Sequence, residues 1–385
     1  MQSPDVIIIG GGIVGSSIAY HLTESGCTNV LILERESHQG KGSTGKSMGG
    51  VRAQFSTSES IRMSLYSIPF FNSFEEVMGH PSGYRAQGYL FVATNQRHLD
   101  YLCQNYTRQV AAGLKTVQLL KPADVAHFAP EIRCDDVLGG AFCSTDGFVD
   151  PHSVMTGFAQ RAMERGVQIL RDAEVTAILT DSRGVAGVVT TAGTFSSRTV
   201  VNAAGAWAGQ VARMAGVDLP VEPLRRMLVP TEPFDKVAQS SPMVVDMATG
   251  FHYRPEGRGI LMAWNDPEET AGFKLNFDPA FIEKILTRGV TRLPVLEEAE
   301  VNPKRAWAGL YEMTPDHHPV LGAVKPLPGF FLANGFSGHG VMHSPATGRI
   351  TADLILKGRT DLIDSTLLSI DRFAVGNLLH ETAIL

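Results

Sequence analysis

The sequence predicts an α/β protein, α+β overall, built from two interleaved domains. Near the start, a β-branched apolar run at residues 6–9 leads into a glycine-rich turn, and residues 18–22 continue as a helix. A second apolar run at 30–33 ends at an acidic residue. Far downstream, the apolar run 199–205 is typical of a parallel strand returning to a core covered on both faces. Together these observations predict a Rossmann-like nucleotide-binding domain.

The glycine-rich turn has the spacing of a dinucleotide-binding fingerprint. Gly10 allows the tight turn, Gly12 lets a pyrophosphate approach the backbone, and Gly15 allows the helix to pack closely on the strand. The N-terminus of the following helix offers free N–H groups and a positive dipole to phosphates. Glu34, at the end of the second strand, is placed to accept hydrogen bonds from ribose hydroxyls. Three neighbours are expected beside this site: Ile13, Val14 and Arg35.

Composition limits the class of protein. At 385 residues the chain is long enough for two domains, and 44% hydrophobic with 19% charged residues is ordinary for a globular protein. The net charge of −6 gives no reason to expect nucleic acid or an anionic membrane surface. No run is long enough to span a bilayer, and the first strand begins too early for a signal peptide. The four cysteines lack a C-x-x-C spacing, so we expect free thiols, no metal and a cytoplasmic location.

Periodicity and turn residues predict the remaining elements. The glycine-rich segment 42–50 is expected to be a loop, and 335–340 is another. Helices are expected at 56–77 with a kink at Pro69, at 96–112, from about 121, from 152 to about 165, at 279–289 and at 345–356. Strands are expected at 89–93, 167–170, 175–179, 185–189 with a hairpin turn at Gly193, and 330–333, and residues 220–305 are expected to be rich in strands and turns. The expected domains are 1–80, 147–220 and 306–385 for the nucleotide, and 81–146 and 221–305 for the substrate.

Four segments together resemble a known family. They are the fingerprint at 6–15, Val-Val-Asn-Ala-Ala-Gly-Ala-Trp at 200–207, Trp-Ala-Gly-Leu-Tyr-Glu-Met-Thr-Pro-Asp at 307–316, and Gly-Phe-Ser-Gly-His-Gly at 335–340. In order and spacing they resemble the D-amino-acid-oxidase-like FAD-dependent amine oxidoreductases, and within them the sarcosine oxidase β subunit and the β-type L-proline dehydrogenases. The resemblance implies an FAD-binding Rossmann-like domain and a substrate domain built on a large mixed sheet.

The resemblance also implies which residues meet FAD. The loop at 43–50 is expected beside the pyrophosphate and flavin, and the helix start at 338–340 is expected to face the flavin edge that gains negative charge on reduction. In relatives, a cysteine or a histidine bonds the flavin covalently; the matching position here is Gly309 and the matching loop has Lys46, so we expect non-covalent FAD. The further cofactor-binding residues so implied are Ser43, Thr44, Lys46, Ser47, Met48, Gly49, Gly50, Val175, Ala204, Gly205, Trp207, Gly309, Gly338, His339, Gly340, Val341 and Met342.

For the substrate, the resemblance implies oxidation of an amino acid to its imine by hydride transfer to flavin N5. Arg52 matches an arginine that grips the substrate carboxylate, with a salt bridge or a phosphate contact as its structural alternative. A second family arginine falls on Gly49 and an assisting lysine on Met342, which implies a roomier site suited to proline over sarcosine. Arg254 is an alternative anchor.

Two tyrosines and three histidines complete the candidates. Tyr253 and Tyr311 resemble pocket tyrosines that orient the substrate, although packing against the flavin is the favoured interpretation. His339 is a candidate general base, but its place at a helix start favours a backbone or flavin contact. His317 and His318 are expected on a surface turn and not at a metal.

Leu261 falls where oxygen-using relatives carry a lysine, which favours a dehydrogenase passing electrons to a quinone, another flavin or an iron–sulfur partner. The alternatives are an oxygen-using oxidase of N-methyl or D-amino acids, and an accessory or electron-relay flavoprotein. A partner subunit or a homo-oligomer fits the resemblance.

Overall fold

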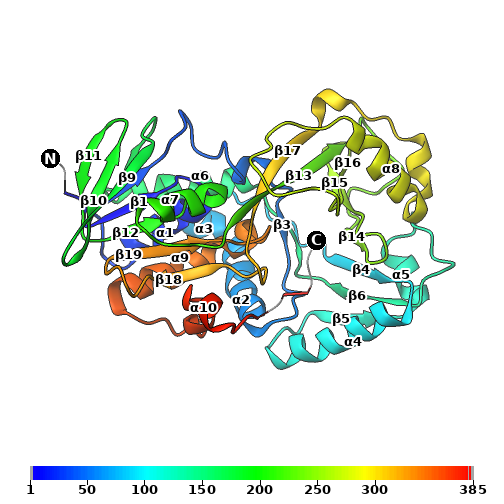
Figure 1. Cartoon of the computed structure of the whole chain (residues 1–385). Coiled ribbons are helices and arrows are strands. Elements are labelled where there is room, and N and C mark those ends of the chain that lie inside the picture. Colours follow the sequence, from blue (N-terminus) through cyan, green and yellow to red (C-terminus); the bar gives the residue numbers. More distant parts are fainter. Residues whose placement is uncertain (1–2, 380, 383–385) are drawn as a thin grey trace.

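The computed structural model describes residues 3–379 and 381–382, and Figure 1 shows two lobes, each centred on one large sheet. The first sheet has six strands in the order β18 (Val320–Ala323), β19 (Phe330–Asn334), β12 (Val200–Asn202), β1 (Val6–Ile9), β2 (Val30–Leu33) and β8 (Gln168–Leu170). All neighbours are parallel except β18 and β19. The sequence prediction of a Rossmann-like α/β domain is confirmed.

Both faces of this sheet are covered, which explains its fully apolar strands. Val6 and Ile8 face a core shared with α1 (Ile13–Glu24), α6 (Pro151–Glu164) and α9 (Gly340–Lys357). Ile7 and Ile9 face the opposite core. That core is completed by α7 (Ala208–Met214) and an antiparallel sheet of β9 (Val175–Asp181), β10 (Gly184–Thr190) and β11 (Gly193–Ser196).

The second lobe holds an eight-stranded mixed sheet. Its order is β17 (Trp307–Met313), β13 (Glu222–Pro230), β16 (Gly259–Ala263), β15 (His252–Glu256), β14 (Met243–Asp246), β4 (Tyr89–Ala93), β6 (Gly139–Cys143) and β5 (Val117–Leu120). Neighbours are antiparallel except β14 and β4. The large mixed sheet implied by the resemblance is therefore present.

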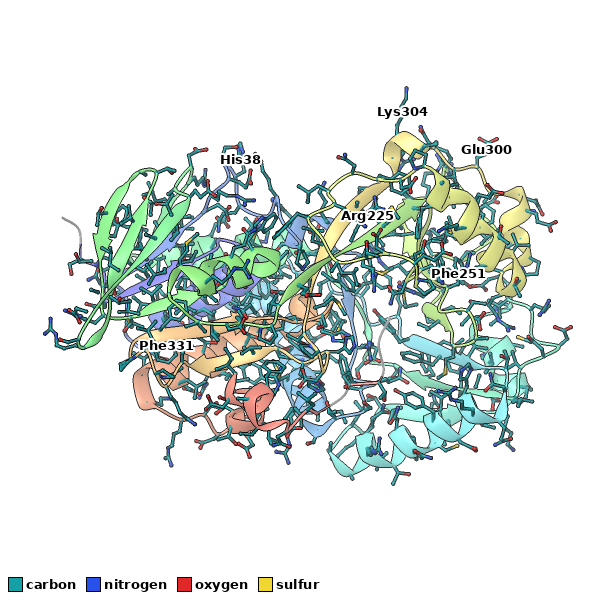
Figure 2. All side chains as sticks on the ribbon, in the orientation of Figure 1. His38, Arg225, Phe251, Glu300, Lys304 and Phe331 are labelled. Carbon is teal, nitrogen blue, oxygen red and sulfur yellow. The ribbon has the colours of Figure 1, made fainter. Side chains whose placement is uncertain are left out.

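Alternation along these strands gives the second sheet two different faces. Leu90, Tyr253 and Met262 point into an apolar core beneath α5 (Pro122–Phe128) and α8 (Ala280–Arg292). Tyr89 and Met243 point the other way, among residues that also pack on α4 (Gln96–Ala111). In Figure 2 the labelled Phe251, which is 1% exposed, lies inside this lobe, whereas Lys304 and Glu300 point outward.

The remaining elements are short, apart from α2 (Ser58–Asn72), which packs beside α9. They are α3 (Phe74–Met78), α10 (Asp371–Val375), the paired strands β3 (Gly50–Val51) and β7 (Gly147–Phe148), and 3₁₀ turns at Thr44–Lys46, Gly205–Trp207, Pro294–Glu298, Pro303–Arg305 and Ser365–Leu368. Over the described ranges, no helix combines the length and apolarity needed to cross a bilayer.

Three expected elements differ in extent or place. The helix expected at 56–77 is two helices, α2 and α3, and Pro69 lies inside the first of them. The last long helix begins at Gly340 and not at 345, because Pro345 is accommodated in its interior. The strand Trp307–Met313 pairs with β13 in the eight-stranded sheet, although we expected residues 306–385 in the nucleotide domain. The other proposed domain limits remain predictions.

Candidate active site

One continuous cavity lies between the two sheets and receives residues from both. The nucleotide side contributes Gly10, Gly12 and Glu34, at the carboxyl ends of β1 and β2. The other side contributes Tyr89 and His252, from the face of the eight-stranded sheet opposite α5 and α8. Carboxyl ends of parallel strands are where α/β sheets bind ligands.

The glycines of the first turn are required by close contacts. Gly10 has φ of +108°, and a Cβ there would lie 2.3 Å from the carbonyl oxygen of Ala203. A Cβ on Gly15 would lie 2.0 Å from the carbonyl oxygen of Gly10. Gly10 and Gly12 line the cavity, whereas Gly15 does not. Gly15 therefore allows helix α1 to pack against the strand, and its placement among cofactor-contacting residues is corrected.

Glu34 is held by backbone groups before any ligand arrives. Its Oε2 accepts a hydrogen bond from the N–H of Gly11 at 3.0 Å, and its Oε1 accepts one from the N–H of Glu36 at 2.9 Å. Next to it, the guanidinium of Arg35 lies 4.2 Å from the ring centre of Trp207. Glu34, Arg35 and Trp207 all line the cavity, so an acid for ribose hydroxyls and an aromatic wall stand together.

The loop between Ser43 and Gly50 is fastened on both sides of the cavity. Thr44 Oγ1 accepts a hydrogen bond from the N–H of Ile13 at 3.1 Å, at the start of α1. Ser43 Oγ donates to the carbonyl oxygen of Leu310 at 2.7 Å, on β17. Arg254 Nε donates to the carbonyl oxygen of Met48 at 2.8 Å. These bonds make the loop a preformed wall that joins the two lobes.

Two predictions about this loop need correction. Arg254 also donates to the carbonyl oxygen of Pro255, pairs with Glu256, and does not line the cavity. It fixes the loop and is not a free carboxylate anchor. Gly49 has φ of +73°, and a Cβ there would lie 2.2 Å from the carbonyl oxygen of Val149. Gly49 does not line the cavity either. A glycine is needed here because of the backbone of Val149, and it adds no room for substrate.

The segment before α9 forms another part of the cavity wall. Gly338 has φ of +100°, and a Cβ there would meet the ring of Tyr311 at 2.5 Å. Glu312 holds this segment because its Oε2 accepts from the N–H of Gly335 at 2.9 Å and its carbonyl oxygen accepts from the N–H of Ser337 at 3.0 Å. Burial raises the pKa of Glu312 to about 7.

His339 and Arg52 form a buried pair at the cavity wall. The distance from Arg52 NH2 to His339 Nε2 is 3.1 Å. Because an arginine can only donate, Nε2 is the acceptor and the ring proton is on Nδ1. Burial, followed by the charge of Arg52, holds the pKa of His339 well below its usual range. Arg52 also donates to the carbonyl oxygen of Gln54 and lies 3.9 Å from the ring centre of Phe55. This geometry leaves Nε2 of His339 unsuited to act as a general base.

Arg226, on β13, is a cation in the cavity that the sequence analysis missed. Its Nε atom is buried and makes no hydrogen bond, and NH1 donates to the carbonyl oxygen of Arg225 at 3.3 Å. Its guanidinium lies 5.4 Å from the ring centre of Tyr311. Within the part of the chain that the structure describes, no carboxylate forms a salt bridge with Arg226. A partly buried guanidinium without an acid is suited to bind an anionic group of a ligand.

Tyr253 was predicted in the pocket, and that prediction is wrong. Its side chain is fully buried on the far face of the sheet, where its hydroxyl donates to Glu131 Oε1 at 2.9 Å. Strand alternation brings the preceding residue, His252, to the cavity in its place. His252 Nδ1 lies 3.0 Å from the carbonyl oxygen of Gly250, and burial lowers the pKa of His252 to about 4.

His317 and His318 do not form an exposed turn as expected. His318 is 1% exposed, its Nδ1 contacts the carbonyl oxygen of Asp316 at 2.9 Å, and its Nε2 contacts Thr57 Oγ1 at 2.9 Å. His317 is half-buried with φ of +60°. A buried ion pair between Asp316 and Arg372 fastens this segment to α10. No set of three metal-ligating side chains is grouped in the described ranges.

Apart from Gly15 and Gly49, every residue predicted to contact the cofactor lines the cavity, and so do Arg52, Tyr311 and His339. Several of the residues missed, Arg226 and His252 among them, lie on strands of the second sheet. Period-two alternation around Gly309 and Tyr311 was a usable signal, but the pairing of β17 with β13, which brings Arg226 opposite Gly309, was not visible in the sequence. The missed lining residues include Tyr89, Gln210, Met214, Arg226, Met227, Leu228, His252, Ala263, Trp264, Asn265 and Glu312.

The cavity fits FAD in shape and chemistry. A glycine-lined strand–helix turn with a fixed acid suits the adenosine and pyrophosphate. The wall continues past Thr44 to Met48 and Gly50 and to the start of α9, whose first N–H groups have no acceptor within the helix. Positions such as Gly10 and Gly338 have no space for a side chain beside this path.

Comparison with known proteins gives the same assignment. The model of the family described as FAD dependent oxidoreductase matches residues 5–354. The chain is 31% identical to FAD-dependent oxidoreductase domain-containing protein 1 of Xenopus laevis, over 97% of this chain and 83% of that protein. It is 30% identical to mitochondrial sarcosine dehydrogenase of Homo sapiens, over 94% of this chain but only 40% of that longer protein.

Solved structures are similar over the whole described fold. L-proline dehydrogenase from P. horikoshii has a TM-score of 0.91 and 29% identity, with 98% of this chain and 99% of that chain covered. Glycine oxidase from Geobacillus kaustophilus has a TM-score of 0.85 and 26% identity, with 97% and 99% covered. With its glycine cradle, fixed acid and family match in agreement, this chain belongs to the FAD dependent oxidoreductase family and has FAD as its cofactor.

Proposed function

We propose that the protein oxidises a secondary or α-amino acid, with L-proline as the leading candidate, to the corresponding imine. The observation that carries the proposal is Arg226, a partly buried guanidinium without a salt bridge among the described residues, which lines the cavity from the eight-stranded sheet. A carboxylate is the ligand group that satisfies it best. The similarity to L-proline dehydrogenase and glycine oxidase supports a small amino acid.

The surroundings of Arg226 suit an amino acid with an apolar body. Leu228 and Ala263, paired on the neighbouring strands β13 and β16, line the cavity on the same face of the sheet as Arg226. These side chains exclude water, which strengthens a charge-assisted bond between Arg226 and the carboxylate. Met342, which replaces a family lysine, also lines the cavity and adds apolar surface. A ring such as that of proline would bury more apolar area here than the methyl group of sarcosine.

The residues of the chain bind and orient the substrate. FAD, when bound, accepts the hydride that leaves the carbon next to the substrate nitrogen. Arg226 holds the carboxylate, and Tyr311 supplies an aromatic wall beside it. Arg52, the anchor first expected, also lines the cavity, but its guanidinium is engaged by the carbonyl oxygen of Gln54 and by His339. No strong base is required, because an amine that binds without its extra proton releases hydride directly.

Anaerobic mixing with L-proline, sarcosine, glycine and D-alanine tests this function. A substrate bleaches the flavin absorbance near 450 nm, and failure of every amine to bleach it would support an accessory flavoprotein and contradict the proposal. Arg226→Leu should raise the Kd for the substrate on the order of 100-fold, since a charge-assisted bond is lost.

The neighbouring residue provides a matched control for the arginine. Arg225, labelled in Figure 2, precedes Arg226 on β13 and pairs with Glu269 at 2.6 Å, outside the cavity lining. Arg225→Leu removes the same charge and should leave the Kd for the substrate nearly unchanged. If Arg226→Leu binds substrate normally and Arg52→Leu does not while retaining FAD, the anchor is Arg52.

We propose that the electron acceptor is a redox partner and not oxygen. Leu261, which matches the lysine of oxygen-using relatives, is 1% exposed and packs with Leu228 and Ala263, against Met48. An apolar cluster offers no charge to stabilise superoxide. Turnover with artificial dyes should therefore exceed peroxide formation in air; equal rates would identify an oxidase.

We also propose that FAD is held without a covalent bond. Gly309 cannot be replaced by a larger residue here, since its Cβ would lie 2.7 Å from Cβ of Lys46. None of the four cysteines, all free, lines the cavity. Acid precipitation should release the flavin into the supernatant, and a yellow pellet would contradict this.

A further inference from the structure

We infer that His252 is a specificity-determining residue whose Nε2 accepts a hydrogen bond from the substrate amine, so that amines with an N–H are preferred over fully substituted ones. The inference rests on the proposed function and goes beyond it, because it assigns the residue that hydrogen-bonds the amine nitrogen of the substrate. Its starting point is the placement of His252 on β15, at the substrate end of the cavity.

The direction of the ring is fixed from two sides. Tyr253, the next residue, is anchored in the apolar core by its bond to Glu131, so His252 must face the cavity. Nδ1 of His252 lies 3.0 Å from the carbonyl oxygen of Gly250. That carbonyl belongs to a tight turn in which the N–H of Gly250 donates to the carbonyl oxygen of Asp246 at 2.8 Å.

These contacts determine which nitrogen carries the proton. A carbonyl oxygen can only accept, so Nδ1 of His252 is the donor. Nε2 of the neutral ring is then a lone pair directed away from the turn. No side chain or backbone group among the described residues donates to Nε2. Burial first, and then the cations Arg52 and Arg226, hold the pKa of His252 at about 4, so the ring stays neutral at physiological pH.

The two polar groups at this end match the two ends of an amino acid. Arg226 is a donor only and suits the carboxylate, whereas Nε2 of His252 is an acceptor and suits an N–H. The carboxyl group of Glu312 is already engaged by the backbone N–H groups of Gly335 and Phe336. An uncharged primary or secondary amine keeps at least one N–H to donate. An uncharged tertiary amine has none and leaves Nε2 without a partner in a buried site.

This difference predicts a measurable selectivity. A buried acceptor without a donor costs about 1–3 kcal/mol, which corresponds to roughly 10- to 100-fold in affinity. L-proline should therefore be oxidised with a kcat/KM at least tenfold above that of N-methyl-L-proline. His252→Leu should remove most of that preference, and His252→Gln, which can place an amide oxygen near the same position, should retain part of it.

Equilibrium binding gives a test that does not depend on turnover. Pyrrole-2-carboxylate and furan-2-carboxylate have nearly the same shape, but only the first carries an N–H. Their Kd values can be measured from the change in flavin absorbance that each causes. The wild-type protein should bind the pyrrole acid at least tenfold more tightly than the furan acid, and His252→Leu should bind both alike.

The outcomes separate this inference from the proposed function. If the wild-type protein prefers the pyrrole acid and His252→Leu keeps the same preference, another group reads the nitrogen and the inference is wrong. Another outcome is that amines bleach the flavin while the wild-type protein distinguishes neither pyrrole-2-carboxylate from furan-2-carboxylate nor L-proline from N-methyl-L-proline. In that case the inference fails while the proposed function stands. If no amine bleaches the flavin, the proposed function fails first. Should His252→Leu lose FAD, His252→Gln provides the comparison: a pyrrole preference below that of the wild type supports the inference, and a preference equal to or above that of the wild type overturns it.

Discussion

The two ends of the cavity are built by different means. At the nucleotide end, the cavity wall is formed by backbone groups and glycines that are close in sequence, as in the turn from Gly10 to Gly15. At the substrate end, side chains from distant strands converge, among them Tyr89, Arg226 and His252. Where backbone groups approach closely, no added side chain can be accommodated, whereas a wall made of side chains can be altered by single substitutions. Substitutions should therefore disturb folding and FAD binding at one end and substrate selection at the other.

The largest effect is expected from Gly10→Ala. The new Cβ would lie 2.3 Å from the backbone of Ala203, at a residue with φ of +108°. We expect a loss of more than about 3 kcal/mol in the free energy of unfolding, with loss of bound FAD, because neither backbone can move away. Denaturant unfolding and the flavin content after purification measure this.

Gly26→Ala is the matched control for that substitution. Gly26 has φ of +89°, but nothing lies within 4 Å of its Cβ position. It should cost only about 1 kcal/mol, the penalty for an alanine in this backbone conformation. Equal losses for the two variants would show that conformation and not the close approach controls this end of the cavity.

Glu312 lies between the two ends, and its titration should make stability depend on pH. Its pKa is raised by burial from 4.5 to about 7, so the folded state binds a proton that the unfolded state has lost between these values. Stability from this group therefore falls as pH rises from about 4.5 to 7, by up to about 3 kcal/mol. Glu312→Gln, which keeps an acceptor for the N–H of Gly335, should remove this component.

The measurement is the difference in unfolding free energy between wild type and Glu312→Gln at several pH values. Other groups titrate in a similar pH range: burial raises the pKa of Asp146 to about 6 and lowers the pKa of His21 to about 4. They are present in both proteins and cancel in the difference. A difference that stays constant from pH 5 to pH 8 would contradict the assignment to Glu312.

The nucleotide end could be predicted from sequence because its determinants are local. The strand at 6–9, the glycine spacing and Glu34 lie within one βαβ unit, and the parallel pairing of β1 with β2 follows from the helix that connects them. The placement of the later loops needed the family resemblance, since a glycine-rich loop alone has no definite partner.

The substrate end could not be predicted in the same way because it depends on strand register. A shift of one residue exchanges the two faces of a strand, and this exchange is the error made at Tyr253. Its neighbour His252 carried no motif, and the apolar residues around it alternate too weakly to choose a face. Arg226 was missed because the pairing of β13 with β17 joins segments about 80 residues apart.

Glu34→Gln should weaken FAD binding and leave substrate affinity intact, which sharpens the contrast between the ends. Both carboxylate oxygens already accept from backbone N–H groups, so the amide would place a donor against one of them. We expect about a tenfold rise in the Kd for FAD, near 1.4 kcal/mol. Flavin titration of the apoprotein measures it, with Glu24→Gln at the exposed end of α1 as the control.

Tyr253→Phe should have the smallest effect and tests the assignment of faces directly. Removal of its hydroxyl leaves the ring in the apolar core and ends one hydrogen bond with Glu131. We expect a loss of about 1 kcal/mol in the free energy of unfolding, because one buried bond disappears. The KM for the substrate and the preference for the pyrrole acid should both stay within twofold of the wild type. A tenfold rise in KM at unchanged FAD content would place Tyr253 in the cavity. It would also contradict the register of β15, on which the role of His252 depends.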